Sequence, residues 1–489
     1  MSGEPVRTSS PVPQRSGTVV AVLAGAGIVV SLMQTLVVPL IPELPQLLHA
    51  SSANASWTIT ATLLAGAVAT PVLGRLGDMY GKRRVLLLSL GLMVVGSVVS
   101  ALGGSLVPMV VGRALQGCAM AVIPLGISIM RDELPPERMG SAMALMSSSL
   151  GVGGALGLPA AAVLAQHTDW HVLFWTSAAL GAVVAGLVRA LVPESPLRTG
   201  GRFDVIGALG LSVGLVCLLL AVSKGGDWGW TSGPVLGLAA AAVLVLLLWG
   251  AWELRAPGPL VDLRTSARPQ VLMTNLVSVV VGFAMYAMSL IVPQLLQLPA
   301  ATGYGLGRSM VEAGLCVAPS GLVMMAVSPL SARLSARKGP KVSLFTGALV
   351  IALGYALALV LMDRVWGVVL FASLIGAGIA FAYAAMPALI MSAVPASETA
   401  AANGLNSLMR AIGTSTSSAV VGVVLAQLTV RMGPVVLPSE QGFRVGFMIG
   451  LGAAVLAALV TLAIPARRPS GAMPPAAPQA VPARAADRV

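Results

Sequence analysis

The chain is 489 residues long, 57% hydrophobic and only 9% charged. A soluble domain carries about 25% charged residues, so this composition excludes an ordinary globular protein. The net charge of +12 is spread over short loops between apolar runs, and no predicted helix carries the basic stripe typical of nucleic-acid binding. The composition therefore indicates an all-α polytopic membrane protein.

Apolar runs long enough to cross a bilayer recur from Thr18 almost to the end of the chain. We predict fourteen spans, at about 18–41, 56–74, 85–104, 106–130, 139–165, 171–192, 204–223, 233–252, 270–298, 311–332, 341–362, 365–391, 403–428 and 443–464. The first run is too long for the apolar core of a secretory signal and is expected to be retained as a span.

The basic residues predict the orientation of these spans. Most of the 29 lysines and arginines fall in loops on the side of both tails, and the opposite loops hold only Lys224, Arg308, Arg364, Arg431 and Arg444. Cytoplasmic loops of membrane proteins carry such an excess of positive charge. Both termini are therefore expected to be cytoplasmic.

A repeated segment divides the chain into two related halves. PVLGRLGDMYGKR at 71–83 aligns without gaps with PLSARLSARKGPK at 329–341, and the same offset lays span one on span nine. Two related helical halves are the usual plan of a secondary transporter, with the substrate site near the midplane. The expected division is a disordered tail at 1–17, a six-helix bundle at 18–193, two inserted helices with their loops at 194–268, a second six-helix bundle at 269–465 and a disordered tail at 466–489.

The segment GRLGDMYGKRR at 74–84 is the predicted loop between spans two and three. Its glycines allow a tight turn and close helix approach, and Asp78 is a lone carboxylate that can pair with an arginine or lie at a helix N-terminus. A loop that only sets topology would account for the basic residues, but the whole pattern is more specific.

This segment resembles the signature loop of the major facilitator superfamily. The matching residues are Gly74, Leu76, Asp78, Gly81, Lys82 and Arg83. The resemblance implies a fold of two pseudo-symmetric six-helix bundles, here with two inserted helices. It also implies a cytoplasmic latch, in which Asp78 holds the halves together in the outward-facing state. The second copy has Ala336 at the position of the acid.

Two further motifs follow in the order of that family. GRALQG at 112–117 resembles its span-four motif, through Arg113, Gln116 and Gly117. A cation inside the membrane is functional by default, and snorkelling to the interface is the alternative. GVGGALGLP at 151–159 is similar to the span-five motif of the family's antiporters, which assigns gating or simple helix packing to Gly151, Gly154, Gly157 and Pro159.

Four other segments resemble the fourteen-span drug:proton antiporter branch of the family: GRFDVIGALGL at 201–211, GGDWGW at 225–230, PLVDLR at 259–264 and NGLNSLMRAIG at 403–413. Span one departs from the branch pattern, because SLMQTLVVPLIPE at 31–43 has Met33 where the branch usually has an aspartate. All seventeen acids are predicted to lie in tails, loops or span ends, so no buried carboxylate is expected.

A buried carboxylate is the common proton carrier, because desolvation brings its pKa toward neutrality. The candidate carriers that remain are Glu43 and Glu312, which are expected to come closest to the membrane interior, and Asp78. Candidate residues along the substrate path are Gln34, Thr35, Asn275, Tyr286, Gln294, Gln297, Tyr383, Met386, Asn406 and Arg410. Core packing is favoured for the Met and Tyr side chains, and pairing with backbone carbonyls is the alternative for Arg410.

The resemblance implies secondary active efflux of amphiphilic small molecules, such as drugs, antibiotics or secondary metabolites. Transport would proceed by alternating access, in exchange for protons, and a monomer is expected. The excess of arginine over lysine and the abundance of alanine, glycine and valine indicate a bacterial chain, and hence a plasma-membrane protein. Arg113 and Arg410 favour neutral or anionic substrates. Without HExxH, CxxC, GxSxG or phosphate-loop motifs, no enzyme, cofactor, metal or nucleic-acid partner is expected. The alternatives are an uncoupled facilitator, a lipid exporter or a non-transporting sensor.

Overall fold

The computed structural model describes residues 13–37, 40, 44–55, 57–198, 200–432 and 435–465. Within these ranges, fourteen helices are long and apolar enough to cross a membrane, as predicted. The first, α1 (Pro13–Thr35), begins inside the segment that was expected to be an N-terminal tail. Residues 1–12 and the expected tail at 466–489 lie outside the described residues.

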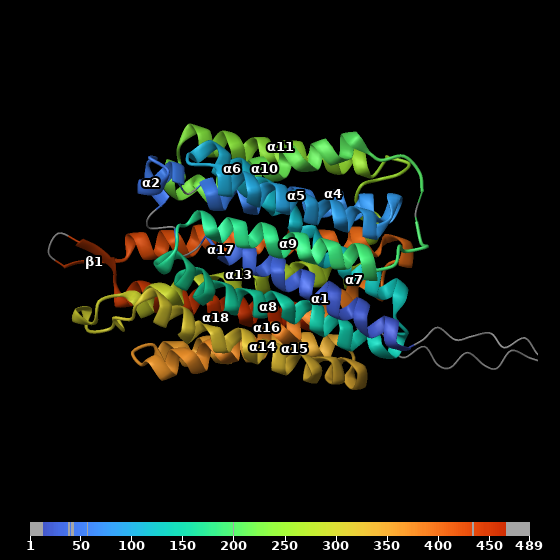
Figure 1. Cartoon of the computed structure of the whole chain (residues 1–489). Coiled ribbons are helices and arrows are strands. Elements are labelled where there is room, and N and C mark those ends of the chain that lie inside the picture. Colours follow the sequence, from blue (N-terminus) through green and yellow to red (C-terminus); the bar gives the residue numbers. More distant parts are fainter. Residues whose placement is uncertain are drawn as a thin grey trace, which may run out of the picture.

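The first half of the chain forms one bundle of long helices (Figure 1). After α1 come two short helices, α2 (Leu44–Leu47) and α3 (Ser52–Ala55), and then the long helices α4 (Trp57–Tyr80) and α5 (Lys82–Leu102). Predicted span four consists of α6 (Leu106–Gly117), one 3-10 turn η2 (Cys118–Ala121) and α7 (Val122–Glu133). The bundle is completed by α8 (Pro136–His167) and α9 (His171–Leu191).

The second half repeats this plan with six long helices. They are α13 (Pro269–Gln297), α14 (Met310–Lys338), α15 (Pro340–Leu361), α16 (Val365–Met391), α17 (Thr399–Gln427) and α18 (Glu440–Ala463). Short 3-10 turns, η3 (Ala300–Thr302) and η4 (Ala396–Glu398), precede α14 and α17. Between the halves lie α10 (Val205–Trp228), α11 (Gly233–Glu253) and the short α12 (Leu263–Ser266). The sequence analysis missed an antiparallel hairpin of β1 (Thr429–Met432) and β2 (Val435–Pro438), which pairs Thr429 with Pro438.

The bundle has two ends, the tail side and the hairpin side. The tail side is the end at which α1 begins and α18 finishes, and the hairpin side is the opposite end, where β1 projects (Figure 1). The halves meet where α8 packs on α14 and where α4 packs on α17. The inserted helix α10 packs against both α4 and α17, and α10 and α11 form one edge of the molecule in Figure 1.

The signature segment is almost entirely helical, so the expected loop at 74–84 is wrong. Helix α4 continues to Tyr80, α5 begins at Lys82, and only Gly81 separates them, with φ of 118°. In the repeat, Gly339 separates α14 from α15 in the same way, with φ of 89°. Side chains with a Cβ rarely adopt such angles, and glycine does so without steric penalty. The two glycines that the repeat aligns therefore perform the same turn.

Candidate functional site

The tail side of the two halves is joined through a helix terminus. Asp78, at the end of α4, is fully buried, and its carboxylate oxygens accept hydrogen bonds from the backbone amides of Ala401 at 2.8 Å and Ala400 at 3.3 Å. These amides belong to the first turn of α17, whose own N-cap residue Glu398 makes no side-chain cap. The unpaired amides and the helix dipole at an N-terminus both favour an anion there. A carboxylate of one half thus caps a helix of the other.

Asp78 is the first member of a buried charged network. The ammonium of Lys82 lies 2.5 Å from Asp132 Oδ2 and 3.9 Å from Asp78 Oδ1, and both Lys82 and Asp78 are fully buried. The hydroxyl of Ser195 also donates to Asp132 Oδ2. Buried charges are tolerated when they are paired and hydrogen-bonded, and removing one partner leaves the other uncompensated. The network therefore ties α4, α5 and α7 to the segment that follows α9.

A second contact between the halves comes from Arg131, which the sequence analysis did not single out as a site residue. Its guanidinium donates to the carbonyl oxygen of Met391 at 3.0 Å, where α16 ends, and to the hydroxyl of Thr399, where α17 begins. Cations are stabilised at helix C-termini, where carbonyl groups lack partners. The only sequence signal for this role of Arg131 was its position at the end of span four, directly before Asp132.

The remaining residues of the signature segment support this junction. A Cβ placed on Gly74 would lie 2.8 Å from the carbonyl oxygen of Ala400, so the absence of a side chain allows α4 to approach α17. The backbone amide of Arg83 donates to Glu194 at 3.1 Å, and its guanidinium donates to the carbonyl oxygen of Arg189, the latter in the last turn of α9. Leu76 packs against the core of the first half.

Arg113 is held inside the first half and does not face the second. It is 3% exposed and donates to Gln116 Oε1 at 2.7 Å and to the carbonyl oxygens of Thr58 and Met33 at 3.3 and 3.4 Å. Gln116 in turn donates to Ser97. A Cβ on Gly117 would lie 2.4 Å from the carbonyl oxygen of Thr62. This depth excludes the alternative of an arginine that snorkels to the interface. The three span-four residues instead hold α1, α4, α5 and α6 together.

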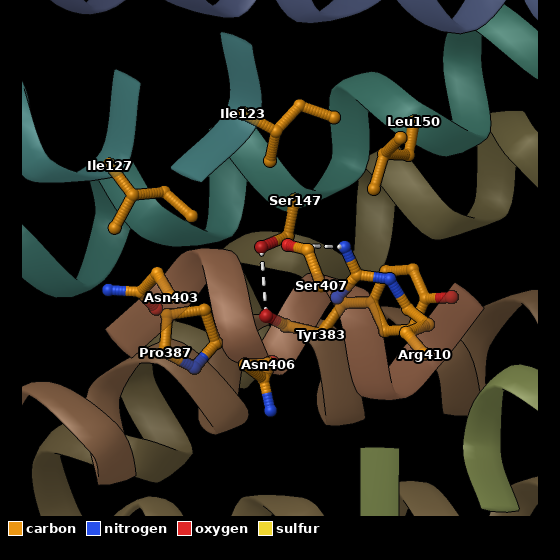
Figure 2. Close-up of a pocket in the computed structure, with 10 residues that line it drawn as sticks. All are labelled: Ile123, Ile127, Ser147, Leu150, Tyr383, Pro387, Asn403, Asn406, Ser407 and Arg410. Atoms are coloured by element: carbon orange, nitrogen blue, oxygen red, sulfur yellow. Dashed lines mark hydrogen bonds between the residues drawn. The ribbon is translucent and has the colours of Figure 1, made fainter. Parts of the chain in front are cut away.

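A pocket lies between the halves (Figure 2). Side chains of α7 and α8 line one side of it and side chains of α16 and α17 line the other; they are Ile123, Ile127, Ser147, Leu150, Tyr383, Pro387, Asn403, Asn406, Ser407 and Arg410. Across the pocket, the hydroxyl of Ser147 donates to the carbonyl oxygen of Tyr383 at 2.9 Å. Six of the ten lining residues are polar, so the pocket offers hydrogen-bonding groups from the second half and from Ser147 beside an apolar wall.

Arg410 is the charged group of this pocket. It stacks over the ring of Tyr383, with its Cζ 4.8 Å from the ring centroid, and donates to the Ser407 hydroxyl at 3.1 Å (Figure 2). Among the described residues it has no carboxylate partner within ion-pair distance and no hydrogen bond to a backbone carbonyl, so the carbonyl-pairing alternative is wrong. Its half-buried guanidinium keeps donors for a ligand.

The structure brings only some of the predicted path residues to this pocket. Tyr383, Asn406 and Arg410 line it, and Asn275 lies behind Asn406 and accepts its amide hydrogen bond at 2.9 Å. The buried Met386 packs in the core of the second half, where its sulfur accepts from Ser278. Five predicted residues lie outside the pocket lining: Gln34 and Thr35 on α1, and Tyr286, Gln294 and Gln297 on α13. The last two are exposed at the hairpin side.

The glycines of α8 serve packing at some positions only. A Cβ on Gly151 would meet Met324 of α14, and one on Gly157 would meet Thr35 of α1. Pro159 lies against Gly314 of α14. Among the described residues, no atom outside the backbone of its own helix lies within 4 Å of the Cβ position of Gly154, so the packing role predicted for it is wrong, and the neighbouring Gly153 packs on α1 instead.

The structure gives a different result for each of the three candidate proton carriers. Glu43 lies outside the described residues. Glu312 lies in the first turn of α14, at the hairpin side: its side chain is 50% exposed, lies 3.7 Å from Arg308 and closes a capping box with Ser309. Asp78 is buried as described above. The expectation that no carboxylate is buried is wrong, since Asp78, Asp132 and Glu253 are all buried at span ends.

The hydrogen bonds between the halves have an asymmetric distribution. Within the described part of the chain, they involve Asp78, Arg131 and Ser147, and therefore run from the central pocket to the tail side. None of them joins the halves at the hairpin side. The structure is thus a state in which polar contacts close the tail side of the central pocket.

Comparison with known proteins identifies what the chain is similar to. The family model described as Major Facilitator Superfamily matches residues 23–418. The tetracenomycin C resistance and export protein of Streptomyces glaucescens is 31% identical over 84% of this chain and 76% of that protein. The multidrug resistance protein Stp of Mycobacterium tuberculosis (strain CDC 1551 / Oshkosh) is 28% identical over the same shares.

Two solved structures share the fold at low sequence identity. The human organic anion transporter MFSD10 superposes with a TM-score of 0.65 at 15% identity, over 93% of this chain and all of that chain. The proton:xylose symporter XylE superposes with a TM-score of 0.64 at 14% identity, over 92% of this chain and 96% of that chain. These likenesses confirm the predicted arrangement of two helical bundles.

Replacing Asp78 by asparagine should open the tail side. The change removes the charge that α17 binds and leaves Lys82 with one acidic partner fewer. Hydrogen bonds to charged groups are worth about 1.5–3 kcal/mol, so the open population should rise by about tenfold or more. The readout is the rate at which a maleimide labels Ile127→Cys, buried in the pocket, in a background without the half-buried Cys118, Cys217 and Cys316.

The matched control for this measurement is Glu137→Gln, because Glu137 is an exposed acid at the start of α8, in the same tail-side region. It removes a carboxylate without touching the junction, so labelling of Ile127→Cys should stay at the rate of the parent. An unchanged labelling rate in Asp78→Asn would show that the carboxylate does not hold the tail side closed.

Proposed function

Because the chain belongs to the major facilitator superfamily, we propose that it is an efflux transporter that exports amphiphilic small molecules by alternating access, in exchange for protons. The observation that carries the proposal is the central pocket, which lies between two similar bundles and which, among the described residues, polar contacts between the halves close on the tail side alone. Relatives named for tetracenomycin C export and for multidrug resistance support the direction and the substrate class.

The orientation follows from charge. The tail side carries most of the basic residues and is proposed to face the cytoplasm of a bacterium, with the chain in the plasma membrane. In this orientation, the contacts seen here close the pocket toward the cytoplasm, and this is the state from which the pocket opens toward the outside. Because one chain supplies both walls of the pocket, a monomer suffices for transport.

The charge of the pocket favours acidic or neutral substrates over cations. Arg410 brings a guanidinium to a cavity otherwise lined by isoleucine, leucine, proline, aromatic and uncharged polar side chains. A cation in that place would be repelled and would lose its hydration shell. The cavity of about 10 Å³ seen here holds no more than a water molecule. In a state in which the halves have moved apart, an anionic group on an apolar body, such as an ionised phenol or carboxylate on a ring system, would bind the guanidinium.

Energy from the proton gradient is the part of the proposal that needs a direct assay. In inside-out vesicles with an imposed proton gradient, adding tetracenomycin C should collapse the gradient when the chain is present. Vesicles without the protein, treated with the same compound, control for passive leak. Export that follows only the gradient of the compound itself, with the proton gradient intact, would contradict exchange for protons and favour an uncoupled facilitator.

Replacing Arg410 by glutamine should separate substrates by charge. Loss of a charged hydrogen bond of about 1.5–3 kcal/mol predicts that efflux of an anionic amphiphile falls by about tenfold to one hundredfold. A neutral analogue of the same ring system should change by less than about threefold, because it does not use the charge. The measurement is initial efflux rate against substrate concentration in loaded vesicles.

Arg431→Gln is the matched control, because Arg431 lies exposed on β1, away from the pocket. Its efflux of both analogues should equal that of the parent chain. Equal losses for the anionic and neutral analogues in Arg410→Gln would show that Arg410 shapes the pocket without recognising charge.

A further inference from the structure

The inserted helices contain a buried acid that the transport path does not use. Glu253, the last residue of α11, is 3% exposed. Neither of its carboxylate oxygens has a hydrogen bond of regular geometry among the described residues, although the indole of Trp249 and the backbone amides of Leu260 and Val261 face the carboxylate. An ionised carboxylate without a partner is costly to bury, whereas a protonated one is much less so. Such a group needs an explanation.

A second carboxylate lies beside it. Asp204 is the N-cap of α10; it accepts from the amide of Gly207 at 2.8 Å and from the indole of Trp252 at 3.0 Å. A Cβ placed on Gly207 would lie 2.4 Å from Asp204 Oδ2 and 2.7 Å from Glu253 Oε1, so the two oxygens are no more than about 5 Å apart. The glycine leaves the space that the two acids share. Two carboxylates this close repel each other when both are charged, which adds to the cost of burying Glu253 as an anion.

No cation on the surrounding elements neutralises the two acids. Asp204 is the charged group that faces Glu253 from α10. In the segment that follows α11, Arg255 is exposed, Asp262 caps α12 and Arg264 donates to the carbonyl oxygen of Leu254. Arg202, which precedes α10, is exposed. Within the described ranges, no lysine, arginine or histidine lies within ion-pair distance of Glu253 or Asp204.

The acid pair is connected to the junction of the halves by the segment 257–266. The backbone amides of its buried residues Leu260 and Val261 face Glu253, and their side chains pack in one cluster with Ala67 of α4 and Leu405 of α17. The same segment lines a cavity together with Arg75 of α4 and Ala401 of α17. Ala401 is the residue whose amide binds Asp78. The segment 257–266 thus lies between the acid pair and the seam at which α4 meets α17.

We propose that Asp204 and Glu253 hold one proton between them in the tail-side-closed state, and that losing this proton loosens the segment 257–266 from the α4–α17 seam. Loss of the proton leaves two negative charges in a buried place, and movement of the segment would admit water to them. A proton bound only in the closed state is linked to closure, so alkaline conditions favour opening. The loosening of the segment 257–266 rests on the proposed alternating access, whereas the shared proton does not.

Infrared spectroscopy of the reconstituted protein tests whether Asp204 and Glu253 share a proton, and it needs no substrate. The carbonyl stretch of a protonated carboxyl group should be present at neutral pH and disappear on titration to alkaline pH. Glu253→Gln should remove that band, and the exposed-site control Glu137→Gln should retain it. Asp204→Asn keeps the helix cap and the acceptor for Trp252 but removes the like charge, so the band should disappear at a lower pH than in the parent.

A carboxyl band that is unchanged in both Glu253→Gln and Asp204→Asn would overturn the shared proton and indicate two ionised acids. If Glu253→Gln fails to fold, the shift in Asp204→Asn decides the question, and an unshifted band overturns the proposal. Uncoupled transport in vesicles would leave these spectra unaffected. Failure of the proposed proton exchange is therefore distinguishable from failure of the acid pair.

Maleimide labelling of Ala402→Cys tests whether loss of the proton loosens the segment 257–266. Ala402 lines the cavity beside this segment, and the background lacks the native cysteines. Because opening releases one proton, labelling of the parent relative to Glu253→Gln should rise by up to about tenfold per pH unit above the pH at which the band is lost. The ratio cancels the pH dependence of the thiol itself. A ratio that stays constant with pH would overturn the link between the acid pair and the seam.

Discussion

The closed state of this chain depends on one carboxylate at one helix terminus. Asp78 of the first bundle caps α17 of the second, and Gly74 allows the two helices to come close enough for it to do so. The contact is specific because the anion binds amide groups that α17 does not satisfy itself. It is also breakable, because it joins the halves through a few hydrogen bonds at one side. Such a junction suits two bundles that must separate in each cycle.

The other tail-side contacts use the same chemistry. Arg131 binds carbonyl groups where α16 ends, and Lys82 holds Asp78 and Asp132 in one buried network. Helix termini supply most of the polar groups of these contacts, and apolar side chains of α4 and α17 pack beside them. The central pocket lies directly beyond these contacts, and Arg410 gives it a charge that the family resemblance alone did not specify. The inserted helix α10 packs across the same seam.

Much of the fold was predictable because membrane spans are long apolar runs, and the repeat at Gly81 and Gly339 fixed the pairing of the halves. The helical conformation of the signature segment was not predictable. The charged residues at 74–84 suggested a loop, but burial and pairing stabilise these residues within helices. Arg113 and Arg410 both drew attention as intramembrane cations, but only the packing separates a structural network from a pocket residue. The sequence analysis placed Glu253 only among the acids in tails, loops or span ends, because its burial depends on how the segment 257–266 and Gly207 pack around it.

The central claim is that the tail side and the hairpin side open in alternation around the Arg410 pocket. Distances between spin labels test it most directly, with one pair at the exposed Tyr80 and Ala396 on the tail side and another at the exposed Leu102 and Trp366 on the hairpin side. The account predicts that adding a transported anionic amphiphile, or changing pH, lengthens one distance while it shortens the other. Two distances that change together, or that do not respond, would contradict alternating access in this chain.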